Sequence, residues 1–248
     1  NREEVDSKLV DDVEKNNIKI FKGFTVTDTS GYKRINNVSI MQLSKDGQKV
    51  VGSKINLTCD CLGVSGGWTP AVHLFTQSGG KLKFSDEDQV FIPNIYPSDQ
   101  LSIGACKGDL TLDSIFTNTP NSLKEFLDIK NTEYENIEVL SSTNKSKRNI
   151  WLLPSDKVLG KTKSFVDFQN DATAKDIKLA LREGFRSIEH VKRYTTTGMG
   201  TDQGKLGNMH ALVIISETTN TKMGDLGTTT FRPPYTPLTF GAIVGRNV

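Results

Sequence analysis

A chain of 248 residues can form one large domain or two small ones, and its formal net charge of +2 gives no bulk excess that would favour nucleic acid or a membrane surface. No apolar run approaches the roughly 18 residues of a membrane-spanning helix, and the first residues lack an apolar signal region. We therefore expect a cytoplasmic protein without nucleic-acid or membrane partners. Since the sequence starts at Asn1 and not at Met, we also expect a fragment of a longer protein.

The first part of the chain predicts an α/β arrangement. Residues 3–16 have the periodicity of a polar helix, and residues 17–70 contain β-type runs with turn signals at 29–31 and 45–47. This order is typical of the later half of a dinucleotide-binding unit. Because the chain has no G-x-G-x-x-G, a cofactor site in it would be incomplete. We expect residues 1–116 to be a partial FAD/NAD-type dinucleotide-binding domain.

The chain contains three cysteines, Cys59, Cys61 and Cys106. An odd number of cysteines, in a sequence whose first residues lack a signal region, favours free thiols in a reducing compartment. The C-x-C spacing of the first two is a weak metal signal, and the flanking Leu57 and Leu62 favour a buried strand. No further Cys or His group completes a zinc ligand set, so we expect no metal site.

Two glycine pairs follow expected strands. Gly66 and Gly67 lie in VSGGWTP, and Gly104 and Gly108 follow the strand expected near residue 92. Glycines at the carboxyl edge of an open α/β sheet let the backbone approach a cofactor, whereas the alternative is a tight turn. Both interpretations stay open for each pair, and we treat the four glycines as candidate dinucleotide contacts.

The remaining chain predicts three further segments. Polar residues 117–148 indicate a linker with one helix at 122–129, and residues 149–220 indicate a small helical domain. Residues 221–248 contain three prolines and predict an extended lead into another domain. In the helical domain, a first helix is expected between a capping box formed by Thr173 and Asp176 and a C-cap at Gly184. Ser187 is expected to cap a second helix. A third helix is expected over residues 203–215, and its inward-facing side chains would be Leu206, Met209, Leu212 and Val213.

The stretch EHVKRYTTTGMGTDQGKLGN, residues 189–208, is too polar for a core. It contains four glycines, three adjacent threonines and several cations. It predicts either a surface loop or a loop that wraps an anion. Lys192 and Arg193 are candidate anion ligands, although charges at a helix end also favour the helix dipole without any ligand. Arg232 is a further candidate, since arginine binds phosphate in a bidentate manner.

Three long motifs carry a family resemblance: VSGGWTPAVHLFTQSGGKL, FVDFQNDATAKDIKLALREGFRSIEHVKRYTTTGMGTDQGKLGN and GTTTFRPPYTPLTFGA. Together they resemble the alpha subunit of heterotetrameric sarcosine oxidase, over nearly the whole chain. The resemblance implies a region that binds NAD, then a small helical domain, then a folate-binding domain like an aminomethyltransferase. This chain would cover the end of the first, all of the second and the lead into the third, so its NAD site would be incomplete.

The resemblance also implies an activity. Members of this family demethylate sarcosine oxidatively to glycine with flavins and oxygen, and tetrahydrofolate can accept the one-carbon unit. The substrate and FAD lie on the beta subunit, and FMN lies where the alpha and beta subunits meet. The implied partners are the beta, gamma and delta subunits. We therefore expect no catalytic residue on this chain, whose isolated fragment would be inactive.

A second resemblance concerns the helical domain, which is similar to iron–sulfur modules of the bacterioferritin-associated-ferredoxin type. At the positions that match the four cysteines of those modules stand Asp167, Gln169, Asp202 and Gly207. A [2Fe–2S] cluster needs four ligands, normally thiolates, so this predicts the scaffold without the cluster. The residues that would then meet the interface FMN are Lys192, Arg193, Thr195, Thr196, Thr197 and Arg232.

Other functions stay open at this point. The chain could be a scaffold or binding module with a degenerate dinucleotide fold and no redox group. It could belong to a related oxidase of N-methyl amino acids or opines, although the missing cysteines favour sarcosine oxidase. A folate-dependent one-carbon transferase is a weaker alternative, suggested by the C-terminal lead.

Overall fold

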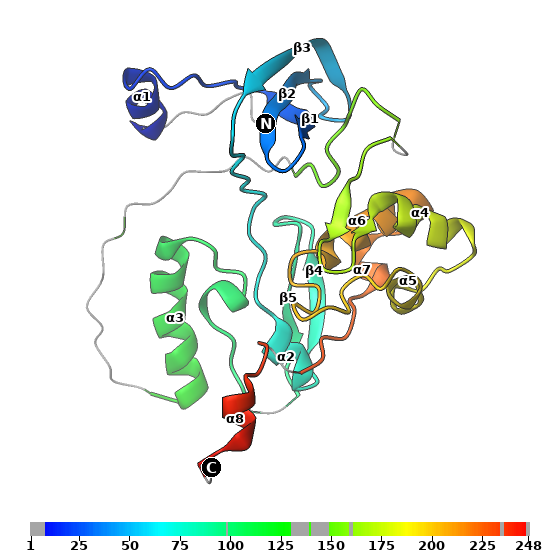
Figure 1. Ribbon diagram of the computed structural model, residues 1–248. Coiled ribbons are helices and arrows are strands. Elements are labelled where there is room, and N and C mark those ends of the chain that lie inside the picture. Colours follow the sequence, from blue (N-terminus) through cyan, green and yellow to red (C-terminus); the bar gives the residue numbers. More distant parts are fainter. Residues whose placement is uncertain are drawn as a thin grey trace. The chain divides into compact units, whose positions relative to one another are not determined.

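The computed structural model describes residues 8–97, 99–129, 139, 149–158, 161–233 and 236–246 (Figure 1). The fold is mixed α/β. The chain forms two compact units, the first drawn from residues 1–66 and 146–163 and the second from residues 67–145 and 164–248. Within the described residues, no helix combines the length and apolar character that a bilayer crossing requires.

The first unit is built on an antiparallel meander of three strands in the order β1-β2-β3. The central strand is the most buried, with four successive buried residues from Val38 to Met41. The turn between the second and third strands has Gly47 at φ 71° and a bond from the Ser44 hydroxyl to Asp46 Oδ1. The elements are α1 (Lys8–Lys15), β1 (Phe24–Gly31), β2 (Ile35–Leu43) and β3 (Val50–Thr58). The expected helix is found in its described part, since residues 3–7 lie outside the described residues. The turn expected at 29–31 is wrong, because these residues end β1 and the chain turns at 32–34.

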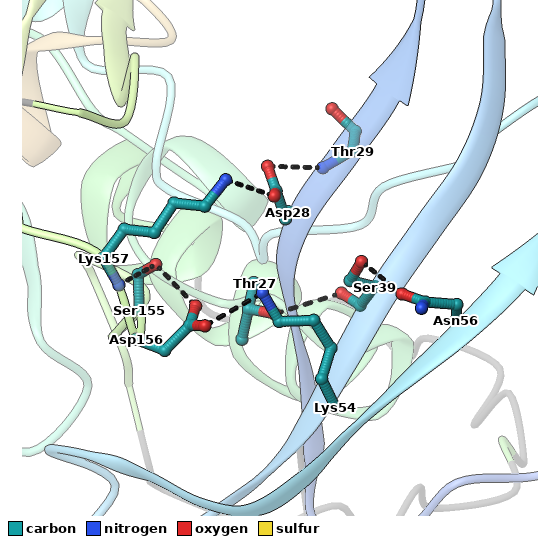
Figure 2. A network of polar contacts seen from close by, with 9 residues as sticks. All are labelled: Thr27, Asp28, Thr29, Ser39, Lys54, Asn56, Ser155, Asp156 and Lys157. Atoms are coloured by element: carbon teal, nitrogen blue, oxygen red, sulfur yellow. Dashed lines mark hydrogen bonds and ion pairs between the residues drawn. The ribbon is translucent and has the colours of Figure 1, made fainter.

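Residues 155–157 return to this meander through two ion pairs (Figure 2). Lys54 Nζ lies 2.9 Å from Asp156 Oδ2, and Lys157 Nζ pairs with Asp28 Oδ2. The hydrogen bond from Lys157 is the main cause that lowers the pKa of Asp28, and the hydrogen bond from Lys54 is the main cause that lowers the pKa of Asp156. The two pairs therefore fasten a distant segment to β1 and β3.

The C-x-C pair does not lie in a buried strand, which corrects the sequence-based expectation. β3 ends at Thr58, so Cys59 is only half-buried and Cys61 is exposed. Both thiols border an open apolar hollow of about 280 Å³ on the meander, together with Phe21 and Phe24. Leu57 and Leu62 also line this open hollow. The apolar residues that flank the cysteines therefore border a surface hollow and do not mark a buried strand.

The second unit begins with α2 (His73–Gln77) and the antiparallel hairpin of β4 (Lys81–Ser85) and β5 (Val90–Ile95). After the short turn η1 (Gly104–Cys106) comes α3 (Leu112–Leu127), which begins well before the expected helix at 122–129. Its start is a capping box, in which the Thr111 hydroxyl accepts the Ser114 N–H and the Ser114 hydroxyl accepts the Thr111 N–H. Pro120 stands inside this helix, where proline removes one helical hydrogen bond.

The rest of the second unit is helical. α4 packs against both α5 and α6, and the shared core contains Ile177, Val191, Leu212 and Ile215. The capping box predicted at Thr173 is present. The elements are β6 (Phe165–Asp167), β7 (Ala172–Thr173), α4 (Ala174–Arg182), α5 (Ile188–Thr195), α6 (Asn208–Thr219), α7 (Met223–Leu226) and α8 (Phe240–Val244).

The third predicted helix starts later than expected. Residues 201–207 form turns, and α6 begins at Asn208 after Gly207. Leu206 is therefore 68% exposed instead of inward-facing, whereas Leu212 and Val213 are buried as predicted. The domain boundaries expected at residues 116, 148 and 220 remain predictions.

Candidate cofactor loop after helix α5

The loop at residues 196–207 joins α5 to α6 and contains two of the candidate residues, Thr196 and Thr197, while Lys192, Arg193 and Thr195 lie just before it on α5. Thr196 ends α5 in the left-handed region, at φ 59°, and Gly198 and Gly204 follow at φ 73° and 74°. A non-glycine residue in this region is uncommon and indicates a loop held by its surroundings.

The glycines of this loop make room for two amide side chains. A Cβ on Gly204 would lie 1.9 Å from Asn208 Oδ1, and one on Gly198 would lie 2.4 Å from the same atom. At Gly200 a Cβ would lie 2.1 Å from Gln169 Oε1. The buried Asn208 in turn donates from Nδ2 to the Thr229 hydroxyl across 2.8 Å. Packing therefore explains why these positions are glycine.

The carboxylate of Asp167, only 5% exposed, is the main polar anchor of the loop. Its Oδ2 accepts the backbone N–H of Gly198, and its Oδ1 accepts those of Gln169 and Asn170. Burial acts to raise the pKa of Asp167, but these hydrogen bonds outweigh it and hold the pKa below its usual value. Asn170 also donates from Nδ2 to the Thr196 carbonyl oxygen, 3.2 Å away.

The four positions expected from the sequence to match ferredoxin cysteines, Asp167, Gln169, Asp202 and Gly207, gather near the end of β6. Gln169 Nε2 donates to the Thr201 hydroxyl across 2.8 Å, and Gln169 Oε1 accepts the Asp202 N–H. A Cβ on Gly207 would lie 2.4 Å from the Val166 carbonyl oxygen. Asp202 Oδ1 accepts the Gly204 N–H and so caps a turn before the start of α6. Within the described ranges, no group of three or more His, Cys, Asp or Glu side chains forms a potential metal site.

The cations form a cluster on α5 and the C-terminal segment. Lys192 is only 8% exposed and its Nζ donates to the Thr230 carbonyl oxygen across 3.3 Å. Burial is the main cause that lowers the pKa of Lys192, and the nearby Arg232 and Arg193 lower it further. Glu189 opposes this shift, and it lies 3.5 Å from Arg193.

The three threonines mainly build the loop. The Thr195 hydroxyl donates to the Val191 carbonyl oxygen and shares a 2.8 Å hydrogen bond with Thr197, which is 3% exposed. The Thr196 hydroxyl donates to the Thr195 carbonyl oxygen, although its residue is exposed. Their abundance thus reflects local hydrogen bonding at the end of a helix.

Arg232 lies beside the same cluster. Its backbone N–H donates to Gln203 Oε1 across 3.4 Å, and the residue is exposed. The structure therefore brings Lys192, Arg193 and Arg232 together with one carboxylate, Glu189. Sequence reasoning missed Glu189 and Asn208, because their roles depend on contacts with residues 229–230 far along the chain.

The other candidate glycines lie apart from this cluster in the sequence and have local surroundings. Gly66 and Gly67 lie in an exposed irregular segment, where an added Cβ would meet nothing within 4 Å. Gly104 packs near Ile115 of α3, and a Cβ on Gly108 would lie 2.9 Å from Ile92 Cγ2. Close packing therefore accounts for Gly108, and a role in dinucleotide binding remains a prediction for all four.

A narrow cavity of about 40 Å³ lies between α2, the β4–β5 hairpin and α6. His73, Asn208 and Phe231 are among its lining residues. Lys192, Arg193 and Arg232 are not among the residues that line this cavity, so it is separate from the cation cluster. Arg193 and Arg232, by contrast, are exposed, so a large cofactor could reach the cations only from the surface of this unit.

Comparisons with known proteins identify the relatives of this chain. Residues 161–246 match the family model described as the sarcosine oxidase A3 domain. The sarcosine oxidase alpha subunit of Rhizobium meliloti (strain 1021) is 33% identical over 88% of this chain, and that of Corynebacterium sp. (strain P-1) is 31% identical over 92%. The chain spans only 23% and 24% of the lengths of these two relatives.

Two further matches are more distant. An opine oxidase subunit of Rhizobium meliloti (strain 1021) is 34% identical over 29% of this chain and 16% of its own length. The crystal structure of L-proline dehydrogenase from P. horikoshii has a TM-score of 0.56 at 17% identity, covering 96% of this chain and 48% of that one. The relatives are named as subunits of oxidases, and the structural match shows the fold. The chain is thus a relative of sarcosine oxidase alpha subunits over most of its length, with an A3 domain at residues 161–246.

Proposed function

We propose that this chain is part of an oxidoreductase alpha subunit that oxidises an N-methyl amino acid, sarcosine, to glycine together with a beta-type subunit. In this proposal its A3 domain contacts FMN at the interface of the two subunits. The observation that carries the proposal is the cluster of Lys192, Arg193 and Arg232 around one carboxylate, beside a loop of fixed geometry.

The charge balance of the cluster supports an anionic ligand. Among the described residues, the charges that act on Lys192 are one carboxylate, Glu189, and two further cations, and Lys192 itself is nearly buried. Burying an ammonium without full pairing costs free energy, and a phosphate or the electron-rich edge of a flavin would offset this cost. The donor set therefore fits FMN, which would supply electron transfer when bound. The side chains of this chain would bind and orient it.

Other parts of the proposal rest on the family resemblance and the described contacts. Residues 1–116 would be the end of a dinucleotide-binding domain whose NAD site is incomplete, with Gly66, Gly67, Gly104 and Gly108 as contacts. FAD, tetrahydrofolate, and the gamma and delta subunits would belong to other parts of a cytoplasmic complex. The helical domain would be a cluster-less ferredoxin-like module, supported by the hydrogen bonds of Asp167 and Gln169 to the loop backbone.

Co-expression with a beta-type subunit tests the proposal. We expect a yellow complex in which Arg232→Ala lowers flavin content or the rate of flavin reduction at least tenfold. Thr196→Ala should have a smaller effect, and Arg182→Ala, which changes an exposed side chain at the end of α4, is the matched control. A complex that forms and keeps the flavin spectrum and reduction rate of the wild type in both variants would rule out this site.

The match to an opine oxidase subunit favours one alternative, an oxidase of opines or of other N-methyl amino acids. A panel of sarcosine, related N-methyl amino acids and opines, offered to the purified complex, separates these substrates. A colourless complex without activity on any of them would instead favour a non-catalytic scaffold.

A further inference from the structure

Residues 229–232, here called the strap, lie outside helices and strands in the second unit. Thr229 and Phe231 are 3% and 8% exposed, while Thr230 and Arg232 are exposed. Thr229 is held by Asn208, and the Phe231 ring lies 4.1 Å from the His73 ring between centroids. The strap therefore buries alternate side chains and presents Thr230 and Arg232 on its other side.

Two charged side chains of α5 bind the backbone N–H and the backbone C=O of one strap residue, Thr230. Glu189 Oε1 accepts the Thr230 N–H across 2.9 Å, and Lys192 Nζ donates to the Thr230 carbonyl oxygen. Glu189 and Lys192 are three residues apart, and so lie on one face of the helix. The same face thus fixes the strap that carries Arg232.

The ammonium of Lys192 retains capacity for a ligand. An ammonium has three N–H donors, and the described residues supply one acceptor for it, at 3.3 Å. An oxyanion can therefore bind Lys192 without displacing the strap. Its negative charge would offset the repulsion between Lys192 and Arg232, which at present lowers the Lys192 pKa.

We propose that binding of a phosphate group at Lys192 and Arg232 is coupled to docking of the strap, and that Glu189 is the positioning residue for this coupling. The docked strap places Arg232 beside Lys192, and the bound phosphate stabilises the docked strap. By linkage the two effects are reciprocal. This inference rests on the proposed function for its ligand, the phosphate of FMN.

The affinity of Glu189 variants for phosphate tests the coupling. A purely electrostatic role of Glu189 and a role in strap docking predict opposite changes in this affinity. Removing an acidic side chain beside three cations should strengthen anion binding by electrostatics. Strap docking predicts that Glu189→Ala weakens FMN and inorganic phosphate binding about fivefold, since Arg232 is released. Glu189→Gln keeps an oxygen acceptor for the Thr230 N–H and should bind at least as tightly as the wild type. Glu183→Ala, at the exposed end of α4, is the control.

Amide hydrogen exchange of the strap in the purified chain completes the test. FMN and inorganic phosphate should slow exchange at Thr230 and Arg232 at least threefold, whereas riboflavin, which lacks the phosphate, should not. Equal or tighter binding by Glu189→Ala, or FMN binding that leaves strap exchange unchanged, overturns the coupling and leaves the proposed function standing. Absence of binding by both FMN and phosphate, in the chain and in its complex, overturns both.

Discussion

The backbone N–H of Gly198 donates to Asp167 Oδ2 across 2.7 Å, so a carboxylate at the end of β6 fixes the loop after α5. Asp167→Ala leaves three backbone N–H groups without this acceptor, and we expect the free energy of unfolding to fall by about 3 kcal/mol. Asp167→Asn should cost less, because one oxygen acceptor remains. Urea denaturation measures both, with the exposed Asp225→Ala as control.

The buried His73 predicts a loss of stability in mild acid. Its pKa is lowered from 6.5 to about 4, mainly by burial and further by Lys205, with Asp202 opposing. The unfolded chain therefore binds the proton more readily, and stability present above pH 6.5 is lost as the pH falls towards 4. The loss is on the order of 3 kcal/mol at most. Urea unfolding of the wild type at several pH values should show the free energy of unfolding falling between pH 6.5 and 4. For His73→Phe the free energy of unfolding should depend less on pH over the same range.

Lys192 predicts that the free energy of unfolding also depends on pH in the alkaline range. Because the folded chain lowers the Lys192 pKa, the unfolded chain binds more protons between that lowered value and 10.5. The ligand-free chain should thus become more stable as the pH rises through this window. Lys192→Met should remove the slope and raise stability at neutral pH, while weakening phosphate binding. Equal pH profiles for the two chains would contradict this account.

Gly204 and Asn208 should show strong coupling. Gly204→Ala places a Cβ within 1.9 Å of Asn208 Oδ1 and strains a residue at φ 74°, so we expect a loss of about 2–4 kcal/mol. In the double variant with Asn208→Ala the clash disappears, and the loss should be smaller than the sum of the two single losses by about 1 kcal/mol or more. Gly184→Ala, at φ 97° in open space, measures the backbone strain alone.

The ion pair between Lys54 and Asp156 should contribute modestly, because both side chains are partly exposed. Lys54→Glu places like charges together and should cost about 1 kcal/mol at low salt. The exchange variant Lys54→Glu with Asp156→Lys should recover most of this loss, and high salt should reduce both effects. A loss that persists in the exchange variant would show that packing, not charge, holds residues 155–157.

Structural features set by neighbouring residues, such as helix caps, could be predicted from the sequence, whereas features set by contacts between distant residues could not. Thr173 and Asp176 lie three residues apart, so their capping box was predicted and is present. The box at Thr111 uses Ser114 in place of the usual Glu or Gln, and α3 was therefore placed too late. Leu206 fits the helical period but lies in a turn whose course is set by Asn208 and its neighbouring glycines.

The site shows the same division. Lys192, Arg193 and Arg232 were chosen by residue type, and the structure brings them together. Glu189 was missed because its partner, the Thr230 N–H, is 41 residues away. The C-x-C pair was expected in a strand because leucines flank it, but the strand ends one residue before Cys59.

Residues 155–157, which form ion pairs with the meander of the first unit, are synthesised long after the meander itself. Asp28 meets Lys157 across 129 positions, so a growing chain exposes the meander before its ion partners exist. At roughly 5–20 residues per second, the ribosome needs on the order of 10 s to bridge that gap. During this interval Asp28 on β1 and Lys54 on β3 lack these ion partners, and the cost of removing their charged side chains from water would oppose premature association of the meander edges.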